Sequence, residues 1–115
     1  MPVFGGSSDS VGLDGSTGGK WGSAGFDDEQ IIVDDLKTLT AGKIGPAGTT
    51  ETLVIIQVDT ANIRWRIGAN ATAAIGVQMA AGDANVFEIA DAALEALTMY
   101  PVSGTPVVNV QYLYR

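Results

Sequence analysis

The glycine-rich stretch GLDGSTGGKWGS, residues 12–23, contains a Gly-Lys pair of the kind that holds nucleotide phosphates. A phosphate-binding loop has the pattern G-x-x-x-x-G-K-[ST] between a buried strand and a helix. Here Asp14 stands where the first glycine belongs, and Trp21 stands where a hydroxyl would hold magnesium. Since an aspartate in the loop would also repel phosphate, we reject the nucleotide-binding interpretation.

The remaining candidate for catalysis is an acid–base pair made by Glu88 and Glu95. Neither glutamate has a basic partner nearby in the sequence, and no pattern around them indicates a cleft. The chain contains no His and no Cys, so it lacks an imidazole base, a thiol nucleophile and the usual zinc ligands. We therefore expect a protein that is not an enzyme and that needs no cofactor.

A dense acidic group is the next chemical feature: Asp27, Asp28, Glu29, Asp34 and Asp35. Carboxylate oxygens suit calcium, but the spacing is not that of an EF-hand, and the apolar run 31–33 interrupts the group. A solvated acidic strand edge is the preferred interpretation, because charge on an edge discourages unwanted pairing. Asp83, after Gly82, is expected to cap the local backbone and not to bind a metal. The formal net charge of −7 argues against binding to nucleic acid.

Large aromatic residues punctuate the N-terminal segment 1–26, which holds eight of the 15 glycines. We interpret this segment as an extended Gly/Ser-rich arm. Phe4, Trp21 and Phe26 either fold back onto the chain's own core or dock on a neighbouring molecule, and the sequence leaves both open. A second candidate interface is the pair Arg64 and Arg66, because arginine forks bind carboxylates across protein contacts. A plain surface role for the two arginines is the alternative.

The elements that would position these residues are short strands within a single domain, residues 27–115 of the 115-residue chain. Period-two and β-branched segments separated by glycine-containing turns predict an all-β fold, a small antiparallel β-sandwich or a jelly-roll-like barrel. In NIRWRIG, Ile63, Trp65 and Ile67 share one face. The predicted strands lie within residues 29–40, 51–60, 62–68, 76–83, 85–90, 94–102 and 107–115.

Residues 91–99 compete as a helix, with Asp91 as the N-cap, and we expect a single helical turn there at most. The chain has no apolar run long enough to span a membrane. Its N-terminus does not resemble a signal peptide, so we expect synthesis in a cytoplasm without secretion.

The block NIRWRIGANATAAIGVQMAAGD, residues 62–83, with the terminal VVNVQYLYR, resembles small β-rich virion proteins of tailed bacteriophages. The matching positions are Arg64, Trp65, Arg66, Thr72, Ala73, Gly76, Met79, Gly82, Asp83 and Tyr114. Ala71 departs from the pattern, since proline is common before the threonine. The resemblance implies a β-sandwich with an extended N-terminal arm that decorates or cements a capsid, or that lies elsewhere in the particle.

Three hypotheses follow. The leading one is a capsid cement or decoration protein, a homotrimer that is made in the host cytoplasm and binds the major capsid protein or other virion proteins across capsomer boundaries. The second is an adaptor in the tail or neck of the virion. The third is a carbohydrate- or cell-surface-binding module, in which exposed rings stack on sugars. Its candidate rings are Trp65, Tyr100, Tyr112 and Tyr114.

Overall fold

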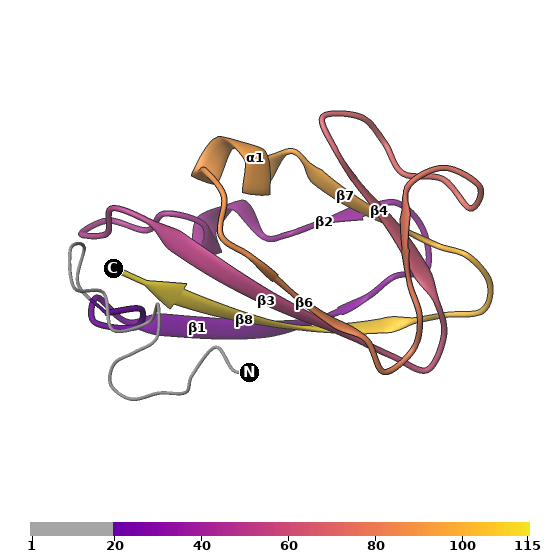
Figure 1. Cartoon of the computed structure of the whole chain (residues 1–115), viewed down its shortest axis with the longest axis horizontal. Helices are drawn as coiled ribbons and strands as arrows, with labels where there is room; N and C mark the ends of the chain where they lie inside the picture. Colours follow the sequence, from indigo (N-terminus) through magenta and orange to yellow (C-terminus); the bar gives the residue numbers. More distant parts are fainter. Residues whose placement is uncertain (1–19) are drawn as a thin grey trace.

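A computed structural model describes residues 20–115, so Phe4 and most of the predicted arm lie outside the described residues. Within this range the chain forms β-strands with two short helical segments (Figure 1). The strands are β1 (Phe26–Ile32), β2 (Lys37–Thr38), β3 (Thr52–Asp59), β4 (Ile63–Ile67), β5 (Val77–Met79), β6 (Ala84–Phe87), β7 (Leu97–Pro101) and β8 (Val107–Tyr114). The helical segments are the 3₁₀ turn η2 (Ala41–Lys43) and α1 (Asp91–Glu95).

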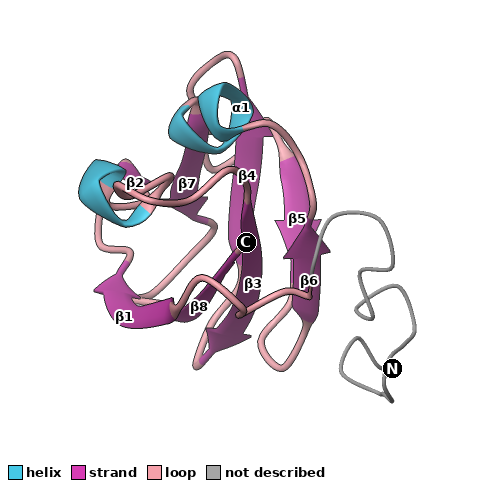
Figure 2. Cartoon of the chain, turned by 90° about the vertical axis from the view of Figure 1, so that its left-hand side faces the viewer, coloured by secondary structure: helices cyan, strands magenta, loops and turns pink. Residues whose placement is uncertain are grey.

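The strands form two four-stranded antiparallel sheets, which confirms the all-β prediction. The first sheet has the order β1-β8-β3-β6 and the second the order β2-β7-β4-β5. The sheets lie against each other as a β-sandwich, with η2 and α1 at one end (Figure 2). Long strands β3 and β8 are central in the first sheet, whereas β1 and β6 are its edges.

The alternation of side chains fixes which residues enter the core. Along β8 every second residue is buried, from Val108 to Tyr114, while the residues between them are half-buried. Because successive strand residues point to opposite faces, one register of this strand fills the space between the sheets. The core cluster consists of Val33, Leu39, Ile44, Val54, Ile56, Val58, Ile63, Met79, Phe87, Leu94, Leu97, Met99, Val108, Val110, Tyr112 and Tyr114.

The segment 29–40, predicted as one strand, is divided between the two sheets. β1 ends at Ile32, a turn follows, and β2 pairs with β7 in the opposite sheet. Val33 is fully buried at the crossing, and its N–H donates to the carbonyl of Pro106 over 2.9 Å. The acidic turn 34–35 therefore allows the chain to change sheets, which hydrophobic periodicity alone does not reveal.

The helical turn before β7 exists, but its cap differs from the prediction. Helix α1 spans five residues, and Ala90 occupies the N-cap position with φ −60° and ψ 150°. Asp91 is the first helical residue, and no side chain caps the helix, so the N-cap assignment of Asp91 is wrong. The physical reason is that Ala90 supplies the extended backbone that precedes a helix, while Leu94 anchors the turn in the core.

Among residues 20–115, no helix has the length and apolar character that crossing a membrane requires.

Candidate functional site

Trp21, a predicted interface residue, lies against the chain's own C-terminus. The guanidinium carbon of Arg115 stands 4.0 Å from the centre of the Trp21 ring, and Arg115 also forms an ion pair of 2.6 Å with Glu51. The backbone around Trp21 is held in place as well, because the N–H groups of Gly22 and Ala24 donate to the carbonyl of Tyr114 over 2.9 and 3.1 Å. Trp21 is therefore half-buried on its own fold.

A cavity of about 420 Å³ lies beside this turn, between the start of β3 and the connection from β6 to α1. Its lining combines the Trp21 ring, threonine hydroxyls and carboxylates. The residues are Trp21, Thr50, Glu51, Thr52, Glu88, Ile89, Ala90 and Asp91. Glu88 is in this lining, and Glu95 is not.

Phe26, the second interface candidate within the described residues, has the opposite environment. It is the first residue of β1, and 73% of its surface is exposed. At the other end of the same strand Ile32 is 55% exposed, and both side chains stand on the outer face of the sheet. Sequence reasoning missed Ile32, although FDDEQII places Phe26 and Ile32 an even number of residues apart.

Arg64 and Arg66 hold a loop of their own chain. The loop, residues 68–76, folds back over the outer face of the β2-β7-β4-β5 sheet. Arg64 donates from Nε to the carbonyl of Ala73 over 3.1 Å and from Nη1 to that of Gly76 over 2.9 Å. Arg66 donates from Nη1 to the carbonyl of Asn70 over 3.2 Å. Both arginines thus have intramolecular partners, and an additional role at an interface stays a prediction.

Threonine side chains complete the support of this loop. The Thr98 hydroxyl donates to the carbonyl of Ala69 and accepts from the N–H of Ala71, which is why Thr98 is 8% exposed on an outer face. Thr72 accepts the N–H groups of Ala74 and Ile75 and so closes the turn. Three residues of the virion-protein pattern therefore hold the loop 68–76 in place, namely Arg64, Arg66 and Thr72.

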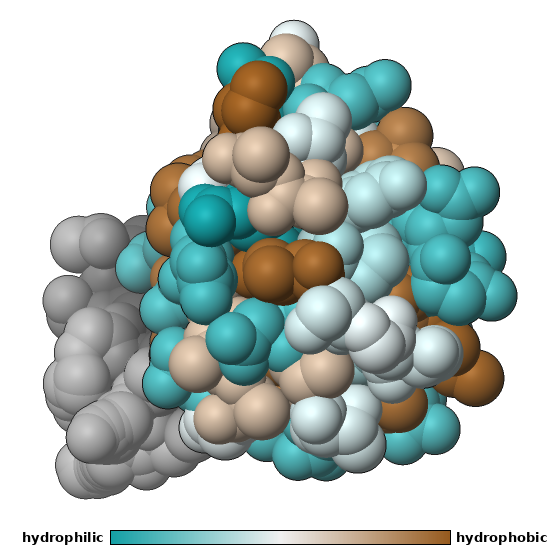
Figure 3. All heavy atoms as spheres, turned by 90° about the vertical axis from the view of Figure 1, so that its right-hand side faces the viewer, coloured by the Kyte–Doolittle hydropathy of each residue, from teal (hydrophilic) through white to brown (hydrophobic). Residues whose placement is uncertain are grey.

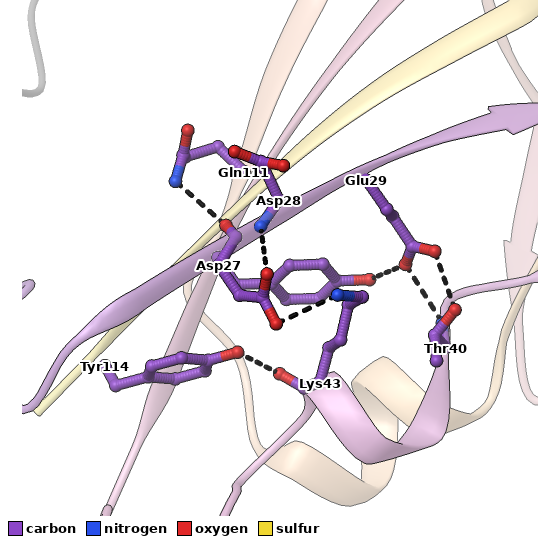
Figure 4. A network of polar contacts seen from close by, with 8 residues as sticks. Asp27, Asp28, Glu29, Thr40, Lys43, Gln111 and Tyr114 are labelled. Carbon is purple, nitrogen blue, oxygen red and sulfur yellow. Dashed lines mark hydrogen bonds and ion pairs between the residues drawn. The ribbon is translucent and has the colours of Figure 1, made fainter.

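A polar network occupies the inner side of β1 (Figure 4). Lys43 forms an ion pair of 2.9 Å with Asp27, whose pKa this hydrogen bond lowers, while Asp27 in turn raises the pKa of Lys43. The Glu29 carboxylate accepts the hydroxyl of Thr40 over 2.6 Å and the hydroxyl of Tyr112. Burial, followed by the Glu29 carboxylate, raises the pKa of Tyr112 above its ordinary value.

This network is a structural device that joins β1 and β8 to the turn η2. Tyr114 adds a hydrogen bond of 2.6 Å from its hydroxyl to the carbonyl of Lys43, and burial raises the pKa of Tyr114. Within residues 20–115, no group of three or more Asp and Glu side chains is placed to hold a metal ion. The predicted local role of Asp83 is confirmed, since its carboxylate accepts the N–H of Ala80 over 2.9 Å.

The rings proposed as a sugar-stacking surface do not share an exposed face. Tyr112 and Tyr114 are 0% and 4% exposed, because both belong to the core cluster. Trp65 packs edge-to-face against Phe87, with ring centroids 5.0 Å apart. These contacts leave Tyr100 as the member of the set that lies outside the core.

Several large apolar side chains are exposed on the described surface. On the loop end of the molecule drawn in Figure 3, hydrophobic and hydrophilic residues are interspersed. By contrast, Phe26 and Ile32 are the two most exposed large apolar residues of the described chain, and they share one edge strand. The outer edge of β1 is therefore the candidate functional site.

Comparison of the chain with protein-family models, with curated proteins and with solved structures finds no match.

Proposed function

We propose that this protein is a non-enzymatic structural component of a tailed-bacteriophage virion, and that it cements the capsid as a homotrimer bound across capsomer boundaries. The observation that carries the proposal is the edge strand β1, whose outer side has no strand partner within residues 20–115 and which exposes Phe26 and Ile32. Apolar side chains in such a place gain free energy when a protein partner covers them. The resemblance of residues 62–83 to small virion proteins supplies the class of partner.

The proposed mechanism is the burial of additional surface between neighbouring capsomers. A ligand that binds the assembled shell and not its separated parts stabilises the shell by mass action, in proportion to occupancy and affinity. A chain without His or Cys is suited to this role, because cementing a capsid requires complementary surfaces and no reactive groups.

The test is the heat resistance of particles with and without the protein. We expect particles that lack it to release their DNA at a lower temperature, and purified protein to restore the resistance when added back. Equal heat resistance of the two preparations contradicts the proposal.

Tailless heads distinguish the capsid from the tail or neck. Isolated before tail attachment, these heads should already contain the protein. Its absence from them, with presence in complete virions, contradicts a position on the capsid.

A further inference from the structure

The outer edge of β1 is an incomplete ladder of backbone hydrogen-bonding groups. In the register with β8, the N–H of Tyr114 donates to Gly25 and the N–H of Val33 donates to Pro106. Odd-numbered residues of β1 therefore direct their backbone groups toward β8, and even-numbered residues direct theirs away from the sheet. The groups directed away belong to Phe26, Asp28, Gln30 and Ile32.

This edge is the longest that the described part of the chain leaves open. β1 has seven residues, whereas the other edge strands β2, β5 and β6 have two, three and four. Within residues 20–115, the outward N–H groups of Phe26, Gln30 and Ile32 meet no backbone acceptor. The N–H of Asp28 is held by the carboxylate of Asp27 over 2.8 Å. A strand added here would gain main-chain hydrogen bonds, as in other cases of β-strand addition.

The negative charge of the β1 edge determines which kind of strand can pair with it. Lys43 compensates Asp27, and Lys37 compensates Asp34 over 3.3 Å. Asp28 and Asp35 are exposed, and neither they nor Glu29 form an ion pair within the described residues. A second copy of β1 would bring the same negative charges to the contact, so the edge disfavours pairing with itself. A basic strand is the complementary partner.

The outer-face side chains of β1 further define which residues a partner strand would present opposite them. In order they are Phe26, Asp28, Gln30 and Ile32, an acidic and an amide side chain between two exposed apolar ones. The depression of about 400 Å³ beside them is lined by polar and aliphatic side chains of the same sheet, among them Ile55, Gln57 and Asn109. Cross-strand neighbours interact when their Cβ atoms are about 5 Å apart, so each outer residue specifies the residue opposite it.

We infer that β1 accepts an extended basic segment of a protein partner as a ninth strand, in antiparallel register. Written from its N-terminus, this segment has the pattern apolar-x-polar-x-Lys/Arg-x-apolar, with its residues opposite Ile32, Gln30, Asp28 and Phe26 in turn. The inference rests on the proposed function in one respect, namely that the segment belongs to a virion protein.

The experiment is a titration of the ¹⁵N-labelled full-length protein with the peptide Val-Thr-Thr-Lys-Lys-Thr-Val, blocked at both ends, up to about 5 mM. The two lysines stand opposite Glu29 and Asp28. We expect amide shifts at Phe26, Gln30 and Ile32, and binding about tenfold weaker for the same peptide with glutamate in place of both lysines. No shifts, equal binding of the two peptides, or shifts centred on β5 or β6 overturn the inference.

Two variants test the edge itself. Gln30→Pro removes an outward N–H and the side-chain bond from Gln30 to Asn109, but it leaves the backbone hydrogen bonds to β8 intact. The fold should therefore persist while peptide binding falls by more than tenfold. Asp28→Lys should weaken binding of the lysine peptide about tenfold and strengthen that of the glutamate peptide. Should Gln30→Pro unfold the protein, Asp28→Lys decides alone, and unchanged peptide preference in it overturns the inference.

These outcomes are independent of the particle experiment. If the protein stabilises particles but its β1 edge binds neither peptide, this inference is wrong and the proposed function is unaffected. Conversely, if the lysine peptide binds selectively but particle stability does not depend on the protein, the capsid role is wrong and the inference that β1 accepts a strand is supported.

Discussion

At the scale of single residues, Tyr112 links the core to the charged side of β1. Its ring is fully buried, and its hydroxyl donates to Glu29. A tyrosine in this position keeps its proton in the folded state at a pH where the unfolded chain has already lost it. Since the unfolded state then binds fewer protons than the folded one, stability falls as pH rises.

The resulting prediction concerns alkaline unfolding. The contribution of Tyr112 should be complete below its ordinary pKa of 10.0 and lost progressively above it. Tyr112→Phe should cost about 1 kcal/mol at neutral pH, through the lost hydrogen bond, and reduce the alkaline slope by up to about 1.4 kcal/mol per pH unit. Urea unfolding between pH 7 and 11 measures both. The Tyr112→Phe variant keeps the part of the slope that Tyr114 and Lys43 contribute, and a slope identical to that of the wild type contradicts the argument.

Arg64 carries a second prediction at this scale. Arg64→Lys keeps the positive charge but cannot donate from two fixed nitrogens to the carbonyls of Ala73 and Gly76. We expect a loss of about 1–2 kcal/mol in unfolding free energy and faster amide exchange in residues 69–76. Arg66→Lys is the matched control, because Arg66 makes one longer bond to the same loop. Equal exchange rates in the two variants would argue against the anchoring role of Arg64.

At the scale of elements, Gly76 determines how the loop 68–76 enters β5. Its φ is +134°, and a Cβ there would lie 2.8 Å from the carbonyl oxygen of Trp65. Gly68, at the other end of the loop, has φ +88° and no atom within 4 Å of such a Cβ. The two positions therefore separate the cost of a strained backbone from the cost of a steric clash.

We predict that Gly76→Ala destabilises the protein by at least about 2 kcal/mol more than Gly68→Ala, which should cost about 1 kcal/mol. Urea denaturation of both variants gives the comparison. Similar losses in the two would mean that the contact with Trp65 relaxes without cost.

The helix α1 offers a change in the stabilising direction. Ala90 already has the extended backbone of an N-cap but no oxygen to accept the free N–H groups of the first turn. Ala90→Ser should therefore increase the unfolding free energy by about 0.5–1 kcal/mol. Ala90→Gly is the control, since it changes the backbone without adding an acceptor. Thermal unfolding measures the stability of both variants, and an increase found with serine alone identifies the cap as its cause.

At the scale of the whole molecule, the turn around Trp21 makes residues 20–25 part of the folded domain. A chain beginning at Asp27 would lose the stacking of Trp21 on Arg115 and the three backbone hydrogen bonds that Gly22, Ala24 and Gly25 make with Tyr114. A chain beginning at Lys20 would keep them. We predict that the shorter chain is less stable by about 2 kcal/mol, measured by urea unfolding, whereas equal stability would mean that the turn adds nothing.

Much of the fold could be predicted, because local chemistry and tertiary packing agree in most of the strands. The segments that became β3, β4 and β8 alternate or run apolar in the sequence, and each is a strand in the structure. The candidate site was less predictable. Arginine is a residue type common at protein interfaces, yet the partners of Arg64 and Arg66 are backbone carbonyls within 12 residues along the same chain. Which acceptor an arginine meets depends on how a loop returns, and residue type does not encode that path.

The sequence by itself determined the all-β class, the glycine-containing turns between strands and the lack of His and Cys, because these depend on composition and on period-two spacing. Only the tertiary structure decided that β1 is an edge, that residues 34–35 carry the chain between sheets, and that Trp21 packs on Arg115. The physical reason is that strand order and sheet assignment arise from contacts between residues far apart in the chain. Gly25 and Tyr114 meet across 89 residues, and no local pattern records such a pairing.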